Sequence, residues 1–187
     1  GLVGSEMCIR DRLYDDEECA AFADQLGWGQ QYRSIKDGPI RADLWRLLLL
    51  HKHGGYYSDI DNIPHVPLKK MGSADFVVSL GVGRGSLNPA FLKAPPNHPI
   101  LRHCLDVYAE MFKRGAPYSY WGYSITAIMA AVVKRVAPLE PGLKRTAIGT
   151  IELLEEKPGN LIGMLTKFVA RKPFLTGFGI YKNKTLI

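Results

Sequence analysis

Residues 40–61 read IRADLWRLLLLHKHGGYYSDID and combine a helix, a glycine stop and a strand. Apolar residues recur at helical spacing from Ile40 to Leu50, and the preceding Asp37-Gly-Pro39 supplies a capping residue and a proline at a tolerated position. The Gly54-Gly55 pair ends the helical pattern, and residues 56–60 have the composition of a strand. The block therefore predicts a helix up to the two glycines and a short strand directly after them.

Two carboxylates close this block. Side chains alternate between the faces of a strand, so Asp59 and Asp61 should point to the same side, with Ile60 toward the core. Two carboxylates on one side repel each other and need a counter-charge, and a hard divalent cation with oxygen ligands is an economical one. Such a cation would keep coordination positions for phosphate oxygens. Taken alone, the pair could also be a solvated turn ahead of Pro64.

Asp43 and Arg46 stand three residues apart on one face of the predicted helix. One interpretation is a surface ion pair that contributes a few tenths of a kcal/mol. Because leucine and isoleucine residues surround both positions, we favour a buried pair with a functional role.

Further elements are expected on both sides of the block. A strand end at Leu13-Tyr14 precedes a helix with an acidic first turn, and residues 75–80 form the clearest strand. Residues 88–92 are interpreted as a strand or a turn. Helices are expected from Pro99 and over residues 124–136. No repeat or long linker divides the chain, so residues 13–187 are predicted to form a single domain, truncated at both ends. Residues 1–12 lack periodicity and are interpreted as a non-native or disordered tail.

Composition excludes several classes of protein. Hydrophobic residues make up 47% and charged residues 22% of the 187 residues, as in a packed globular protein. No apolar stretch approaches the ~20 residues that a membrane-spanning helix needs. Three cysteines without C-x-x-C spacing suggest neither a zinc site nor a disulfide framework, and they are expected to be small buried hydrophobic residues. The net charge of +6 comes entirely from residues 134–187, and without a nucleic-acid motif we expect no nucleic-acid partner.

Three weaker signals leave alternatives open or point to no site. Residues 81–85 (GVGRG) fit no phosphate-loop pattern and are interpreted as a flexible loop. The sequence after Asp59 lacks the ligands and the glycine of a helix–loop–helix calcium site. An aromatic group could stack on a sugar ring or a base, or pack in the core. Its members are Tyr118, Tyr120, Trp121 and Tyr123.

The central block resembles the DXD-containing sugar-binding region of the family 32 glycosyltransferases. This group includes yeast-type initiating mannosyltransferases and relatives of α-1,4-galactosyltransferases, and clostridial glucosylating toxins have a similar core. The matching residues are Ala42, Asp43, Arg46, Gly54, Gly55, Tyr57, Asp59 and Asp61. A second, weaker similarity covers residues 88–101, where Asn88 and His98 match an Asn-x-x-Phe and a Pro-x-His-Pro segment. Together the two similarities extend over about residues 13–125.

The resemblance implies an α/β, GT-A-like (Rossmann-like) nucleotide-diphospho-sugar transferase fold and metal-dependent, retaining glycosyl transfer. By this carry-over, Asp61 would bind Mn²⁺ or Mg²⁺, and Asp59 would contact the metal or the donor. Asp43 and Arg46 would hold sugar hydroxyls. Tyr57, Asn88 and His98 are further expected substrate-binding residues. The expected partners are a UDP- or GDP-sugar donor and a glycan, lipid or protein acceptor.

The chain also departs from the family pattern. The family's first strand, which helps to seat the nucleotide base, has no counterpart before Leu13, and its closing loop with His and Trp has none after Gly177. Relatives include Golgi-lumen enzymes, which are type II membrane proteins with an upstream anchor, and enzymes of the bacterial cytoplasm. The resemblance is compatible with both locations. Two alternatives to an enzyme remain: a catalytically inactive sugar- or metal-binding fragment of the same fold, and a basic surface-association domain acting through residues 134–187.

Overall fold

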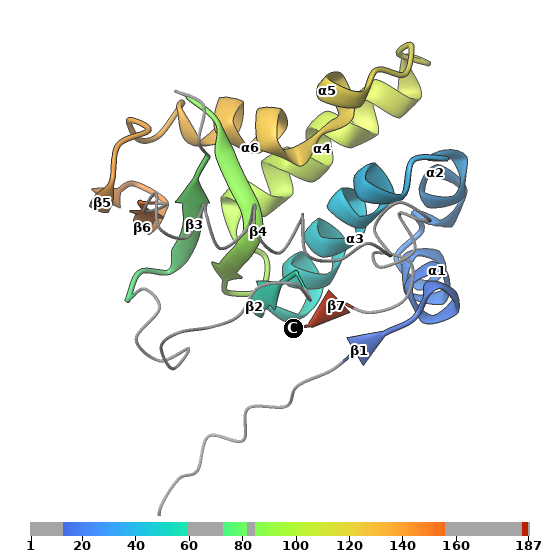
Figure 1. Ribbon diagram of the computed structural model, residues 1–187, viewed down its shortest axis with the longest axis horizontal. Helices are drawn as coiled ribbons and strands as arrows, with labels where there is room; N and C mark the ends of the chain where they lie inside the picture. The colour runs from blue at the N-terminus through green and yellow to red at the C-terminus, as the bar shows by residue number, and fades with distance from the viewer. Residues whose placement is uncertain (1–12, 60–72, 82–84, 156–184, 187) are drawn as a thin grey trace, which may run out of the picture.

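The computed structural model describes residues 13–59, 73–81, 85–155 and 185–186 of the chain. Its helices and strands come in runs along the sequence (Figure 1). The helices are α1 (Asp16–Gln25), α2 (Gly29–Ser34), α3 (Gly38–His53), α4 (Pro99–Lys113), α5 (Tyr120–Tyr123) and α6 (Ile125–Val133). The strands are β1 (Leu13–Tyr14), β2 (Gly55–Ser58), β3 (Phe76–Leu80), β4 (Leu87–Ala94), β5 (Gly142–Thr146), β6 (Gly149–Leu154) and β7 (Thr185–Leu186).

One mixed sheet holds the described strands in the order β1-β7-β2-β4-β3-β6-β5. β4 pairs antiparallel with both β2 and β3, β3 pairs parallel with β6, and β5 returns antiparallel along β6. The two-residue strands β1 and β7 extend the edge next to β2. The α/β class predicted by the resemblance is therefore confirmed, while its GT-A-like subtype stays a prediction.

Local signals explain where the helices begin. Asp15 caps α1 in a capping box: its side chain accepts a hydrogen bond from the Glu18 amide, and the Glu18 carboxylate accepts one from the Asp15 amide. His98 and Ser124 cap α4 and α6 in a similar way, each accepting a hydrogen bond from the amide two residues later. Asp37 precedes α3 as predicted, but its side chain makes no capping bond there.

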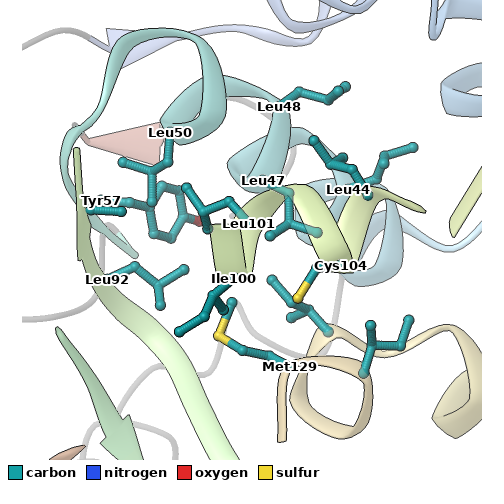
Figure 2. Packing of buried hydrophobic residues seen from close by; sticks show 14 of the residues in the cluster. Leu44, Leu47, Leu48, Leu50, Tyr57, Leu92, Ile100, Leu101, Cys104 and Met129 are labelled. Carbon is teal, nitrogen blue, oxygen red and sulfur yellow. The ribbon is translucent and has the colours of Figure 1, made fainter. Parts of the chain in front are cut away.

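The main core lies between one face of the sheet and the helices α3, α4 and α6, which pack side by side (Figure 1). Figure 2 shows leucines of α3 meeting Tyr57 and Leu92 of the sheet, with residues of α4 and α6 completing the layer. Leu44, Leu47, Leu49 and Leu50 are fully buried. Burial of each such side chain contributes roughly 1.5–3 kcal/mol. This core fixes α3 on the sheet, and with it Asp43 and Arg46.

A smaller apolar cluster covers the opposite face of the sheet. It contains Val77 and Phe91, with Tyr56 and Leu154 packed against it. Tyr56 and Tyr57 therefore lie on opposite faces of β2, as alternation along a strand requires. Tyr57 is the one that enters the main core, where it is 1% exposed.

Most of the predicted elements are present. The helix before Gly54, the strands at residues 55–58 and 76–80, and the helices from Pro99 and Ile125 are confirmed. Residues 87–94 form a strand, which settles the choice between strand and turn. The short helix α2 was not predicted. Cys19 and Cys104 are free and buried as expected, and Cys8 lies outside the described residues.

Within the described ranges, no helix has both the length and the apolar character needed to cross a membrane.

Candidate functional site

The predicted site begins at the turn between α3 and β2, where Gly54 lets the chain reverse beside β4. Its φ of 64° and ψ of −164° lie in a region that is essentially restricted to glycine. A Cβ atom on Gly54 would stand 2.5 Å from Pro96 Cδ and 2.6 Å from Pro96 N. Only glycine therefore allows this close approach, which brings the end of β2 under the charged residues of α3.

Arg46 is the centre of the site. The residue is 4% exposed, and its guanidinium contacts two carboxylates: Nη2 lies 3.2 Å from Asp43 Oδ1, and Nη1 lies 3.3 Å from Asp59 Oδ1. Nη1 also donates a 2.8 Å hydrogen bond to the Pro89 carbonyl. Two carboxylates around one guanidinium leave a net charge of −1 when both are ionised. The site is therefore suited to a cation or to the hydroxyl donors of a polar ligand.

Asp43 is held from two sides. Its Oδ1 faces Arg46, and its Oδ2 accepts a 3.1 Å hydrogen bond from the Ile125 amide at the start of α6. Burial raises its pKa from 3.8 to about 6, although Arg46 and the Ile125 amide act in the opposite direction. The ion pair between Asp43 and Arg46 is thus buried, as we favoured from the sequence, and the surface alternative is wrong.

Tyr57 joins the strand to the charge cluster. Its hydroxyl donates a 2.6 Å hydrogen bond to Asp59 Oδ1, and the Arg46 guanidinium lies 4.6 Å from the centre of its ring. Burial raises the tyrosine pKa well above 10, so the hydroxyl keeps its proton and acts as a donor. The structure places its ring in the main core and its hydroxyl on Asp59, and binding of substrate by Tyr57 stays a prediction.

Asp59 follows β2 directly and is partly buried. Its amide donates a 2.9 Å hydrogen bond to the Ala90 carbonyl, which fixes the backbone against β4. The sequence suggested that a cation balances this carboxylate, but a protein group, Arg46, already supplies one positive charge at 3.3 Å. Asp61, the second predicted carboxylate, lies outside the described residues.

The described residues can supply part of a metal site. Asp59 offers hard carboxylate oxygens of the kind that Mn²⁺ and Mg²⁺ prefer. Asp43 is less suited, because Arg46 and the Ile125 amide already contact both of its oxygens. Within the described ranges, no group of three or more His, Cys, Asp or Glu side chains is arranged to hold a metal. A metal here would need Asp61 or ligand oxygens in addition to Asp59.

Asn88 lies on the strand that borders the cluster. β4 is irregular at this point, because β3 pairs Val78 with Leu92 but the next residue, Ser79, with Asn88. Pro89 lacks the amide that regular pairing would use, and its carbonyl is directed to Arg46 instead. Asn88 Oδ1 accepts a 3.1 Å hydrogen bond from the Ala90 amide, so its side chain stabilises this irregular stretch.

The structure does not bring His98 to the cluster. It follows the opposite end of β4, where its ring stacks on Phe76 with centroids 5.1 Å apart and Nδ1 accepts from the Ile100 amide. It is 3% exposed, and burial lowers its pKa. These contacts describe a helix-capping residue of the core, and they give no support to the predicted role in substrate binding.

Two backbone groups of the site had no signal in the sequence. The Pro89 carbonyl and the Ile125 amide reach the cluster from positions 43 and 82 residues away from their partners. Only the sheet order and the packing of α6 bring them there. Pro89 within an expected strand was the one indirect hint, because a proline at such a place often marks an irregularity.

Comparisons with known proteins agree with the position of the cluster. No curated protein matches the chain, and no solved structure does. Residues 9–77 match a family model, and this segment includes Asp43, Arg46, Tyr57, Asp59 and Asp61. Over these residues the chain is similar to the glycosyltransferase sugar-binding region containing the DXD motif.

Proposed function

We propose that this chain is a metal-dependent, retaining glycosyltransferase domain of the GT-A type. It would transfer a sugar from a UDP- or GDP-sugar to a hydroxyl of a glycan, lipid or protein acceptor. The observation that carries the proposal is the buried charge network of Asp43, Arg46 and Asp59, which lies within the segment that matches the sugar-binding region. Buried charges are costly to desolvate, and clusters of them with perturbed pKa values are common at functional sites.

The chemistry of glycosyl transfer matches this arrangement. Negative charge grows on the departing diphosphate as the bond to the sugar breaks, and groups that meet this charge stabilise the transition state more than the ground state. Asp59 and Asp61 would hold Mn²⁺ or Mg²⁺, which supplies the compensating positive charge when bound.

The other residues of the cluster orient these carboxylates and the donor. Arg46 holds Asp59 Oδ1 on the side of α3, together with the Tyr57 hydroxyl, so that the second carboxylate oxygen is held in a defined direction. Asp43 and Arg46 together would contact hydroxyls of the donor sugar. The main role of Arg46 would be to hold the Asp43 carboxylate in place. Retention of configuration would follow from attack by the acceptor on the same face that the diphosphate leaves.

The experiment is donor cleavage and transfer with the full chain. A panel of UDP- and GDP-sugars is incubated with and without Mn²⁺, and release of the nucleotide is measured for the wild type and for the Asp59→Asn/Asp61→Asn variant. Asp24→Asn is a matched control, because this exposed aspartate pairs only with Arg33 on the surface among the described residues. Circular dichroism verifies that each variant is folded.

The outcomes distinguish an active enzyme from an inactive binding fragment. Metal-dependent release that is lost in the double variant and kept in Asp24→Asn supports the enzyme. Donor binding without any release, in a folded chain, contradicts it and supports the catalytically inactive sugar- or metal-binding fragment.

A further inference from the structure

An exposed group of aromatic side chains lies close to the charge cluster. Among the described residues, five large hydrophobic side chains are exposed. Three of them, Tyr118 (53% exposed), Tyr120 (43%) and Trp121 (72%), follow one another at and just before α5. We call these three residues the aromatic wall. The other two are aliphatic, namely Val136 and Leu143. A concentration of exposed aromatic area of this kind is a sign of a binding surface.

The wall rests on a firm support. Tyr123, at the end of α5, is buried against Tyr108 and Phe112 of α4, beside which α5 lies in Figure 1. The Tyr108 hydroxyl donates to the Tyr123 carbonyl, and the Tyr123 hydroxyl donates to the Ala116 carbonyl at 2.9 Å. The Ser119 side chain caps the single turn through the Gly122 amide. The exposed rings therefore project from a fixed backbone, which reduces the entropy lost when a ligand binds.

The wall is continuous with the proposed donor site. α5 leads through Ser124 directly to the Ile125 amide, which donates to Asp43. Burial, and after it a hydrogen bond between the Tyr118 hydroxyl and the Asp37 side chain, raise the pKa of Tyr118 to about 12. Burial, and after it the charges of Asp43 and Asp37, raise the pKa of Tyr120. The Tyr120 phenol is therefore within electrostatic reach of Asp43 in the cluster, and Tyr118 reaches Asp37, which directly precedes α3.

We propose that the aromatic wall binds a pyranose ring of a glycan and holds it as the acceptor for the cluster at Asp59. A pyranose has flat C–H faces rimmed by hydroxyls. Flat aromatic rings can cover such a face, while phenol and indole groups and a nearby carboxylate exchange hydrogen bonds with the rim. The acceptor role rests on the proposed glycosyl transfer, whereas binding of the sugar to the wall does not. The proposal selects the glycan from the three acceptor classes that the sequence leaves open.

Binding is tested first, with the full chain and no donor. Methyl α-D-mannopyranoside, methyl β-D-galactopyranoside, cellobiose and maltotriose are titrated, with saturation-transfer NMR and tryptophan fluorescence as readouts. At least one of them should bind the wild type, with a blue shift from the exposed Trp121 indole. Trp121→Ala should weaken this binding about tenfold, which corresponds to about 1.4 kcal/mol. Leu143→Ala is the matched control: Leu143 is 53% exposed, as Tyr118 is, but lies on the edge strand β5, and its variant should bind as the wild type does.

Transfer is tested next, with the donor that the panel identifies. The ratio of transfer to hydrolysis should fall about tenfold in Trp121→Ala and stay unchanged in Leu143→Ala. Equal binding of the saccharides by the wild type and Trp121→Ala, or no binding of any of them by the wild type, would overturn the proposal. Loss of binding to phosphatidylcholine vesicles in Trp121→Ala, without any saccharide effect, would overturn it in favour of a lipid acceptor. Trp121-dependent saccharide binding without donor cleavage would support the sugar-binding wall and refute the transfer and the acceptor role.

Discussion

Replacement of Asp43 by asparagine tests the electrostatics of the site through its effect on stability. The Asp43 carboxyl has a pKa of about 6 in the folded protein, against 3.8 when unperturbed. Between pH 3.8 and about pH 6, the Asp43 carboxyl keeps its proton in the folded state but has released it in the unfolded state. The folded state therefore binds more protons, and the free energy of unfolding must fall as the pH rises through this interval. The raised pKa thus stabilises the fold at low pH, and that contribution is lost by about pH 6.

The size of the effect follows from the shift. A change from 3.8 to about 6, at 1.36 kcal/mol per pKa unit, corresponds to roughly 3 kcal/mol. Asp43→Asn has no titrating group at this position. The difference in unfolding free energy, wild type minus variant, should therefore fall by most of this amount between pH 4 and pH 7. His51 and His98 titrate in the opposite sense because burial lowers their pKa values, but they are present in both proteins and cancel.

The assay is urea unfolding at pH 4, 5, 6 and 7, followed by far-UV circular dichroism. Asp24→Asn serves as the control, because pairing with Arg33 lowers the Asp24 pKa, so that its contribution is lost mainly as the pH falls below 3.8. The wild type minus Asp24→Asn difference should be nearly flat from pH 5 to pH 7 and fall slightly at pH 4. A flat difference for Asp43→Asn as well would refute the reasoning, since it would mean that Arg46 fully offsets the cost of burying the carboxylate.

Two further substitutions test the geometry. Gly54→Ala should lower the free energy of unfolding by at least ~1–3 kcal/mol from backbone strain, with the contact against Pro96 in addition. Gly38→Ala, where a Cβ meets no atom within 4 Å, should leave the thermal midpoint nearly unchanged, and equal midpoints for the two variants would contradict the close approach. Tyr57→Phe removes a hydroxyl that donates to a carboxylate and should cost roughly 1.5–3 kcal/mol in urea unfolding. Tyr123→Phe removes a bond to a neutral carbonyl and should cost less, so the reverse order would be evidence against the Tyr57–Asp59 bond.

The sequence predicted the elements whose signals are local. α3 carries a proline near its start and an apolar stripe, and two glycines follow its end, and each signal acts over a few residues. The helix α2 has none of these. It begins at Gly29 without a side-chain cap, and tertiary contacts hold it, namely burial of Tyr32 and the ion pair between Arg33 and Asp24. Such contacts depend on how the chain has already folded, so residue patterns do not reveal them.

The candidate site, like the fold, was predictable only where its contacts are local in the sequence. Spacing placed Asp43 beside Arg46, because residues three apart share a helix face. The contact between Arg46 and Asp59 crosses a turn and depends on the position of α3 over β2. The contact with Pro89 depends further on β4 lying next to β2 in the sheet, although β3 precedes β4 in the chain. Sheet order is a property of the whole fold, so it cannot be predicted from the residues around Arg46.

The alternation of side chains along β2 explains why the counter-charge of Asp59 is an arginine. Alternation puts Asp59 on the same face as Tyr57, and Tyr57 is buried in the main core. Asp59 therefore points toward α3 rather than toward solvent, and a carboxylate in that position needs a positive charge within the fold. Arg46 supplies it one helical turn beyond Asp43. Asp61 lies outside the described residues, and its place on this side stays a prediction from the sequence. Because Arg46 already has two carboxylates as partners, a third carboxylate here would require a second positive group, which is the physical case for a divalent cation or a bound ligand at this end of β2.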